Sequence, residues 1–220
     1  MDQPLVQALV AVGVILLVAF PVHEFSHALA AFRLGDSTAR YMGRLTLDPR
    51  VHFDPIGGGM LALSALLSQG GFFFGYAKPT PVNPANLEGG RRGEALVALA
   101  GPLSTLVLAA LVAVPLRLIA SSDELLFSVI GSDVGSFFFG IGRYFVLINV
   151  FLFIFNLLPI PPLDGWKVLT GLVDARTAYS LRQVEQYAFF LIIAVFFFGG
   201  RIIGPIGIAI YGLLLGDRFV

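Results

Sequence analysis

Two histidines and a glutamate lie close together in the segment PVHEFSHALA, residues 21–30. In an α-helix, residues i and i+4 share one face, so His23 and His27 can both present a ring nitrogen to one ion, with Glu24 beside it. Zinc suits such nitrogen ligands, and it lowers the pKa of a bound water toward neutrality. Glu24 is then placed to accept the proton of that water. The spacing therefore predicts the zincin arrangement, with His23 and His27 as metal ligands and Glu24 as general base.

The alternative interpretation of this segment is that three polar residues stand at a helix end by chance. The chain has only three His among 220 residues. Random shuffling would produce the HExxH pattern in roughly one such chain in a thousand. The flanking stretches, Val14–Val22 and Ala28–Phe32, are apolar. Ionisable residues are costly in a lipid-facing helix and mark a functional site by default, so the metal interpretation is favoured.

Two histidines leave a third ligand to be found. The chain has no Cys, which leaves His, Asp and Glu as strong ligands. We expect the third ligand to be Asp164, near the end of NLLPIPPLDG, residues 156–165. Pro159, Pro161 and Pro162 cannot continue a helix, so the backbone unwinds and lets Asp164 turn into a cavity. The alternative is an ordinary helix stop followed by an Asx turn.

The composition indicates the kind of element that carries these residues. Hydrophobic residues make up 57% of the chain and charged residues 13%. A soluble domain carries about a quarter charged residues, so we expect an all-α polytopic membrane protein that forms one domain over residues 1–220. No Lys or Arg precedes the first apolar stretch, so we interpret it as a retained helix and not as a signal peptide.

A helix needs roughly 20 apolar residues to cross the hydrocarbon layer. We expect four to five transmembrane helices. The last stretch contains Gly199, Gly200 and Arg201, so it is predicted as one long tilted helix or as a hairpin of two short ones. The candidate spans are Pro4–Phe32 (residues 4–32), Glu94–Ile119 (94–119), Phe137–Leu158 (137–158) and Tyr187–Leu215 (187–215).

The charges of the loops predict the topology. Basic residues occur in residues 33–93 and again after Leu158, whereas the loop 121–136 has acidic residues and neither Lys nor Arg. The positive-inside rule places the basic loops in the cytoplasm. This requires the glycine-rich stretch Ile56–Tyr76 to be re-entrant. The HEFSH segment and Asp164 then both lie toward the cytoplasmic side, where they can meet in one pocket.

The motifs resemble those of the site-2 proteases, peptidase family M50, which are zinc metalloproteases that cut within the membrane. The resemblance extends from HEFSHALAAFRLGD through GRLTLDPRVHFDPIGG, GYAKPTPVNP and AGPLST to NLLPIPPLDG. It implies one Zn²⁺ per chain with His23, His27 and Asp164 as ligands, Glu24 as general base, and Asn156 as the residue that binds the scissile carbonyl or its oxyanion. The chain looks like a compact member without PDZ or CBS modules.

The resemblance implies cleavage of transmembrane segments of single-span proteins, and we expect no nucleic acid as partner. The compact chain without sorting signals indicates a prokaryotic cytoplasmic membrane. A substrate helix must unwind locally before it can be cut. An exposed strand edge could hold it, and the alternating run Arg44–Leu47 is our candidate for part of a short β-hairpin. The sequence specifies neither the substrate nor the oligomeric state.

Two other functions stay open at this stage. One is a metal transporter or channel, since His and Asp ligands at membrane depth can line an ion path. The other is an inactive membrane scaffold. A transporter needs no base between its ligands, so Glu24→Gln separates it from a protease.

Two further residues have uncertain roles. His52, in DPRVHFDP, is a loop residue between two proline turns, a fourth metal ligand, or part of a second metal site with Asp48 and Asp54. The turn interpretation is favoured. Lys78 has no role beyond a positive charge that fits the cytoplasmic side.

Overall fold

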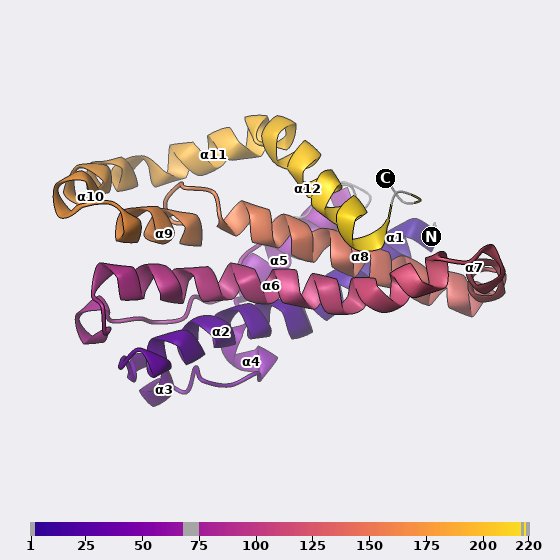
Figure 1. Cartoon of the computed structure of the whole chain (residues 1–220), viewed down its shortest axis with the longest axis horizontal. Coiled ribbons are helices and arrows are strands. Elements are labelled where there is room, and N and C mark those ends of the chain that lie inside the picture. The colour runs from indigo at the N-terminus through magenta and orange to yellow at the C-terminus, as the bar shows by residue number, and fades with distance from the viewer. Residues whose placement is uncertain (1–2, 68–74, 217, 219–220) are drawn as a thin grey trace.

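The structure, a computed structural model, describes residues 3–67, 75–216 and 218. Helices account for the regular secondary structure in these ranges (Figure 1). Their bounds are α1 (Gln3–Val14), the π-helical turn η1 (Ile15–Ala19), α2 (Phe20–Arg33), α3 (Thr38–Tyr41), α4 (Pro49–His52), α5 (Pro55–Leu67), the 3₁₀ turn η2 (Pro84–Asn86), α6 (Arg91–Ala120), α7 (Asp123–Ile130), α8 (Asp133–Asn156), α9 (Asp164–Leu172), α10 (Ala175–Arg182), the 3₁₀ segment η3 (Gln183–Tyr187), α11 (Ala188–Phe198) and α12 (Gly200–Leu215).

Three helices are long and apolar enough to cross a membrane: Leu5–Arg33, Arg91–Ala120 and Asp133–Asn156. They coincide with the first three predicted spans to within a few residues at each end. A fourth apolar unit joins Ala175–Val195 to Gly200–Leu215 through a bend of 70°. The chain is therefore an all-α integral membrane protein with three to four candidate spans in its described part.

The bend explains why the last apolar block was ambiguous. The sequence left open one long helix or a hairpin, and the structure shows neither, because α11 and α12 meet at an intermediate angle. Gly199 lies at the bend, where a Cβ would be 2.4 Å from the carbonyl oxygen of Val195. The glycine pair thus breaks the helix without reversing it.

The first span contains a widened turn. The π-helical turn η1 joins α1 to α2, and the N–H of Phe20 donates to the carbonyl of Ile15, five residues earlier. Pro21 follows at once; it has no N–H, and its ring would crowd the carbonyl four residues before it. Single π turns of this kind accommodate such defects within long helices. The HExxH residues come directly after this turn.

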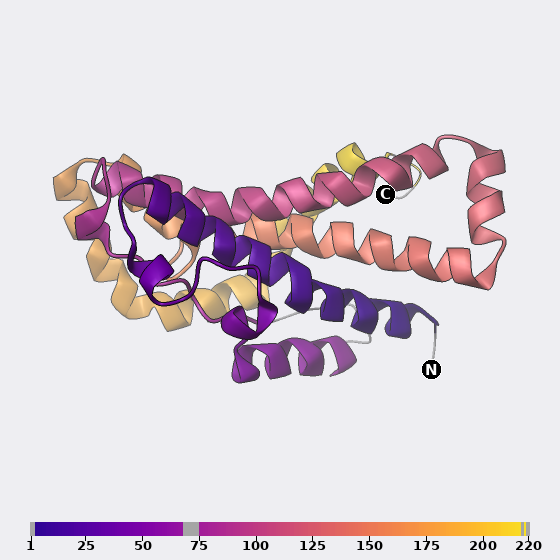
Figure 2. The ribbon, with the colours of Figure 1, turned by 90° about the horizontal axis from the view of Figure 1, so that it is seen from below.

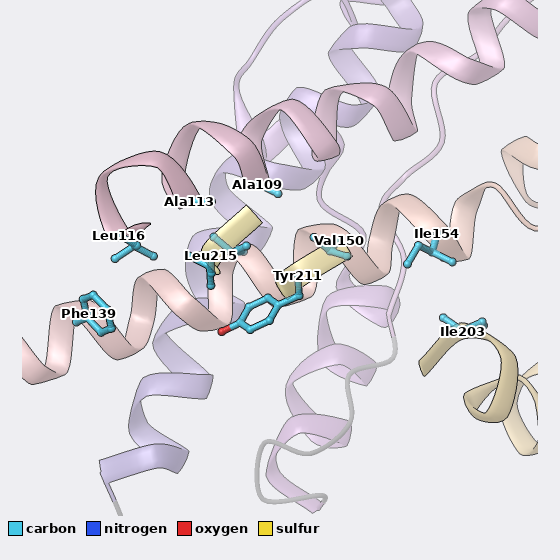
Figure 3. Close-up of a cluster of buried hydrophobic side chains, with 10 residues drawn as sticks. Ala109, Ala113, Leu116, Phe139, Val150, Ile154, Ile203, Tyr211 and Leu215 are labelled. Atoms are coloured by element: carbon cyan, nitrogen blue, oxygen red, sulfur yellow. The ribbon is translucent and has the colours of Figure 1, made fainter. Parts of the chain in front are cut away.

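Helix α6 is the centre of the packing, because it contacts α2, α8, α9 and α12. One buried apolar cluster joins α6, α8 and α12 through residues such as Ala113, Val150 and Tyr211 (Figure 3). A second cluster joins α1, η1, α5 and α8. These contacts fix α2, α6 and α8 relative to one another, and the candidate site lies among them.

The charged loops separate to opposite ends of the molecule. Figure 1 shows α7, which carries Asp123 and Glu124, at one end, with α3, α9 and α10 at the other. Arg40 lies in α3, and Arg176 and Arg182 lie in α10. This is the separation that the loop charges predicted. The membrane side of each end stays a prediction.

The two ends of the predicted re-entrant stretch Ile56–Tyr76 lie close together. Helix α5 runs beside α1 (Figure 2), and residues 68–74 lie outside the described residues. After them, the N–H of Lys78 donates to the carbonyl of His52, just before α5, at 2.8 Å. Gly57 permits this return, since a Cβ there would be 2.0 Å from the carbonyl oxygen of Tyr76. Both ends of the stretch therefore meet beside α4.

The predicted β-hairpin is not supported, because no strand occurs in the described ranges. Residues 44–47 form a bent, non-helical segment between Gly43, at φ 69°, and α4. Arg44 does not alternate outward as an edge residue would. Its side chain is buried, and its guanidinium donates to the carbonyl of Val51 at 2.7 Å. This turn chemistry overrides the alternating pattern of Arg44–Leu47.

Candidate metal centre

Three potential ligand atoms converge from two helices. His23 and His27 project from one face of α2, and Asp164 is the first residue of α9. Oδ2 of Asp164 lies 3.2 Å from Nε2 of His23 and 3.2 Å from Nε2 of His27. The two Nε2 atoms lie 3.1 Å apart. In the described part of the chain, this is the one cluster of three or more His, Cys, Asp or Glu residues with metal-ligand geometry.

A contact with α6 determines which ring nitrogen of His27 carries the proton. Nδ1 of His27 lies 2.7 Å from the carbonyl oxygen of Val97, which can only accept a hydrogen bond. In the neutral ring Nδ1 therefore carries the proton, and Nε2 offers a lone pair toward His23 and Asp164. A backbone partner on the far nitrogen is the usual way in which proteins orient a metal-binding imidazole.

The donor set fits zinc. Zinc binds His nitrogen and Asp oxygen at about 2.0–2.2 Å in tetrahedral sites, for which neighbouring ligand atoms are about 3.3 Å apart. The observed separations of 3.1–3.2 Å agree with that spacing. Two imidazoles and one carboxylate leave a fourth position free for water or substrate, as in catalytic zinc sites.

A short non-helical loop brings Asp164 to the histidines. Helix α8 ends at Asn156, and the chain turns through the proline-rich segment before α9 begins at Asp164. Gly165 allows the loop to fold back tightly, since a Cβ there would be 2.2 Å from the carbonyl oxygen of Leu157. The unwinding predicted from the prolines therefore occurs, and it turns Asp164 inward.

Glu24 is held by a residue that the sequence analysis did not select. The backbone N–H of Thr80 donates to Oε2 of Glu24 at 2.7 Å, and Oγ1 of Thr80 donates to the carbonyl of Glu24 at 3.0 Å. Pro79 and Pro81 flank Thr80 and have no N–H. The N–H of Thr80 is therefore the one backbone donor among these three residues, and it binds the carboxylate that is predicted to act as general base.

A buried carboxylate fixes the segment that carries Thr80. Asp36 has no exposed surface, and it accepts hydrogen bonds from the N–H and hydroxyl of Thr38, the N–H of Asn83 and the amide of Asn86. Burial alone would raise the pKa of Asp36, but these hydrogen bonds outweigh it and hold the pKa below its usual value. Asp36 thereby ties residues 83–86 to the end of α2.

Asn156 lies at the edge of the same cavity, as the last residue of α8. Its side-chain nitrogen donates to the carbonyl of Leu152 at 2.9 Å, which fixes the orientation of the amide. The structure thus brings Asn156 to the cavity that holds His23, Glu24, His27 and Asp164.

The cavity has a volume of about 640 Å³, and both apolar and charged side chains line it. Phe20, Leu152 and Phe155 give it apolar walls, whereas Glu94 and Lys167 line it near the starts of α6 and α9. The non-helical segment around Ala77–Thr80 forms a further wall. Arg44–Leu47, the predicted substrate edge, does not line it.

His52 has structural contacts in this fold, and the backbone N–H of Lys78 donates to the carbonyl of His52. His52 is buried at the end of α4, and its Nε2 lies 2.8 Å from the carbonyl oxygen of Thr46. Asp48 pairs with Arg50, and Asp54 accepts hydrogen bonds from the first N–H groups of α5. These three side chains therefore form no metal cluster, and His52 is a helix-end residue rather than a loop residue.

Comparisons with known proteins agree with the motifs. The profile of Peptidase family M50 matches residues 128–199, which include Asn156 and Asp164. A Bacillus subtilis (strain 168) protein named "Putative zinc metalloprotease YwhC" is 35% identical over 181 residues, which cover 82% of this chain and 77% of the relative. A Mycobacterium tuberculosis (strain ATCC 25618 / H37Rv) protein named "Putative zinc metalloprotease Rip2" is 33% identical over 199 residues, which cover 88% of this chain and 70% of the relative.

No solved structure matches the chain with significance. The assignment therefore depends on sequence similarity, and that similarity covers most of both chains for the Bacillus relative. Together with the profile match over the Asp164 motif, it shows that the chain belongs to Peptidase family M50, the family of the site-2 proteases.

Proposed function

We propose that the chain is a zinc-dependent endopeptidase that cleaves transmembrane segments of single-span proteins, with its active site toward the cytoplasmic side of a prokaryotic cytoplasmic membrane. One observation carries the proposal: His23, Glu24, His27 and Asp164 line one cavity among membrane-length helices. A structural histidine pair would not need a carboxylate base beside it or an open cavity in front of it.

His23, His27 and Asp164 would hold the ion through Nε2, Nε2 and Oδ2. When bound, zinc acts as a Lewis acid on a carbonyl oxygen and lowers the pKa of a coordinated water. Glu24 accepts a proton on its carboxylate and later delivers it to the departing amine. Thr80 holds Oε2 of Glu24 at 2.7 Å, so Oε1 stays available for that transfer.

Asn156 would act on the substrate. Its amide has donated one hydrogen to Leu152 and has a second one left for the carbonyl oxygen that gains charge during the reaction. A fixed donor of this kind stabilises the transition state without reorganising.

The walls of the cavity suit a peptide that comes from lipid and meets water. Phe20, Leu152 and Phe155 provide apolar contacts for substrate side chains. Glu94 and Lys167 line the same cavity and give water a polar route. A substrate helix must unwind there, because its carbonyls are otherwise bonded within the helix.

The test is cleavage of a panel of single-span proteins by purified protein in detergent, with zinc content measured on the same samples. Wild type should cut, whereas Glu24→Gln should keep its zinc and lose about 10²–10⁴-fold in rate. Glu124→Gln makes the same chemical change in α7, outside the cavity, and should keep most of the activity. Full activity in Glu24→Gln, or zinc binding by wild type without cleavage of any substrate, would contradict the proposal.

A further inference from the structure

Gly101, in α6, lies directly against the two imidazole rings. A Cβ at this position would be 2.2 Å from Nε2 of His27, 2.5 Å from its Cε1 and 2.7 Å from Nε2 of His23. Zinc–imidazole bonds are about 2.0–2.1 Å long. The side chain that Gly101 lacks would therefore fill the space that lies at bonding distance from the ring nitrogens.

Helix propensity gives no reason for glycine at this position, and the one local reason is Pro102, whose ring crowds the Cβ of the residue before it. Gly101 is in the interior of the 30-residue helix α6, where alanine is the more favourable residue. Its φ is not among the positive values of the described glycines, so its extra conformational freedom is not used. Pro102 follows and removes a further helical N–H donor. The environment of Gly101 therefore requires the absence of a side chain, and not the conformational freedom of glycine.

Val97, one turn before Gly101 on the same face of α6, contacts the other side of His27. Its carbonyl oxygen lies 2.7 Å from Nδ1. Helix α6 therefore faces both nitrogens of the ring: the carbonyl of Val97 accepts a hydrogen bond from Nδ1, and Gly101 presents no side chain to Nε2. A side chain at position 101 would push α6 or the ring away and break this pairing.

We propose that Gly101 is a positioning residue of the metal centre: it leaves the volume for the ion while keeping α6 close enough for Val97 to orient His27. This inference rests on the proposed function, because it assumes that zinc binds at His23, His27 and Asp164. It predicts that a single methyl group at position 101 competes with the metal.

The experiment compares Gly101→Ala with two other helical glycines in zinc competition against a chelator and in thermal unfolding with and without zinc. Gly204→Ala adds a methyl with nothing within 4 Å. Gly207→Ala adds one 2.7 Å from Cζ of Phe151, a clash in the α8–α12 packing. Both controls should keep the zinc-dependent rise in Tm, although Gly207→Ala should unfold at a lower temperature. Gly101→Ala should lose most of that rise, and its zinc affinity should fall by about 10–100-fold.

The outcomes separate this inference from the proposed function. A zinc-dependent rise in Gly101→Ala equal to that of wild type overturns the role of Gly101 and leaves the proposed function standing. A wild type without any zinc-dependent rise overturns both.

A second comparison covers the case in which Gly101→Ala fails to fold. In a His23→Ala/His27→Ala background the rings that meet the methyl are gone, so adding Gly101→Ala should lower Tm no more than Gly204→Ala does in wild type, since both glycines precede a proline. If it still lowers Tm as strongly as Gly207→Ala does in wild type, the methyl clashes with other parts of the protein, and the inference is wrong.

Discussion

Helix α2 supplies His23, Glu24 and His27 from little more than one helical turn, whereas Asp164 comes from α9 after a non-helical, proline-containing loop. The spacing in α2 follows from helix geometry alone. The position of Asp164 depends on the packing of α2, α6, α8 and α9. The two halves of the metal centre therefore differ in what fixes them: local periodicity in one, tertiary packing in the other.

Each half also has its own supporting contacts. On the α2 side, Val97 orients His27 and Thr80 holds Glu24. On the α8–α9 side, Asn156 is fixed by its own helix, and Gly165 permits the tight turn before Asp164. Substitutions can therefore separate metal binding, proton transfer and transition-state stabilisation.

The largest expected effect comes from removing the ligand of the α9 half. Asp164→Ala leaves α2 and its two imidazoles intact, so zinc affinity should fall by more than about 100-fold, and cleavage should become undetectable. Zinc content by mass spectrometry and the cleavage assay measure this on one sample. Full zinc and full activity in Asp164→Ala would mean that the α2 half binds the metal without α9.

Asn156→Ala should separate catalysis from metal binding within that same half. The loss of one oxyanion donor lowers the rate by about 10²–10³-fold, and the zinc content should stay at the wild-type level. Asn149→Ala, two turns earlier in α8 and fully buried, is a control for the loss of an amide away from the cavity. A drop in zinc content for Asn156→Ala would show that this residue supports the metal instead.

Thr80→Pro addresses the α2 half. It removes the N–H that holds Oε2 of Glu24, so the cleavage rate should fall by about 10–100-fold while zinc stays bound. Thr80→Ala keeps the N–H and loses only the hydroxyl bond, so its rate should fall less. Equal rates for the two variants would show that the backbone donor does not orient Glu24.

The smallest effect on catalysis is expected at Asp36, which acts through the segment that carries Thr80. Asp36→Asn puts an amide where four donors converge, so at neutral pH the free energy of unfolding should fall by about 1–3 kcal/mol. The pKa of Asp36 is lower in the fold than in the unfolded chain. Its contribution is therefore complete above the unfolded pKa of about 3.9 and is lost as the pH falls toward the folded value.

Thermal unfolding in detergent over a pH series measures the contribution of Asp36 to stability. The difference in stability between wild type and Asp36→Asn should shrink once the pH drops below about 4. A difference that stays constant across the series would show that the charge of Asp36 is not what the four donors stabilise.

The sequence was sufficient for the parts of the fold and the site that follow from periodicity and composition. The first three spans, the HExxH half and the unwinding before Asp164 could be predicted in this way. The predicted hairpin at Arg44–Leu47 is not supported, because turn residues and the buried Arg44 outweigh a four-residue alternation. Short patterns of this kind are compatible with several structures until packing decides among them.

Contacts between distant segments could not be predicted from spacing. Thr80 is 56 residues from Glu24, and Val97 is 70 residues from His27. The prolines on both sides of Thr80 and the glycine before Pro102 were visible in the sequence, but their partners become known only when α6 and the Thr80 segment are packed against α2.

The most direct test of the metal centre is zinc K-edge X-ray absorption spectroscopy of the purified wild-type protein. The geometry of His23, His27 and Asp164 predicts one zinc per chain with two imidazole nitrogens and oxygen ligands at about 2.0–2.2 Å in a tetrahedral shell. A zinc shell without imidazole scattering, or a folded protein that binds no zinc, would contradict the account.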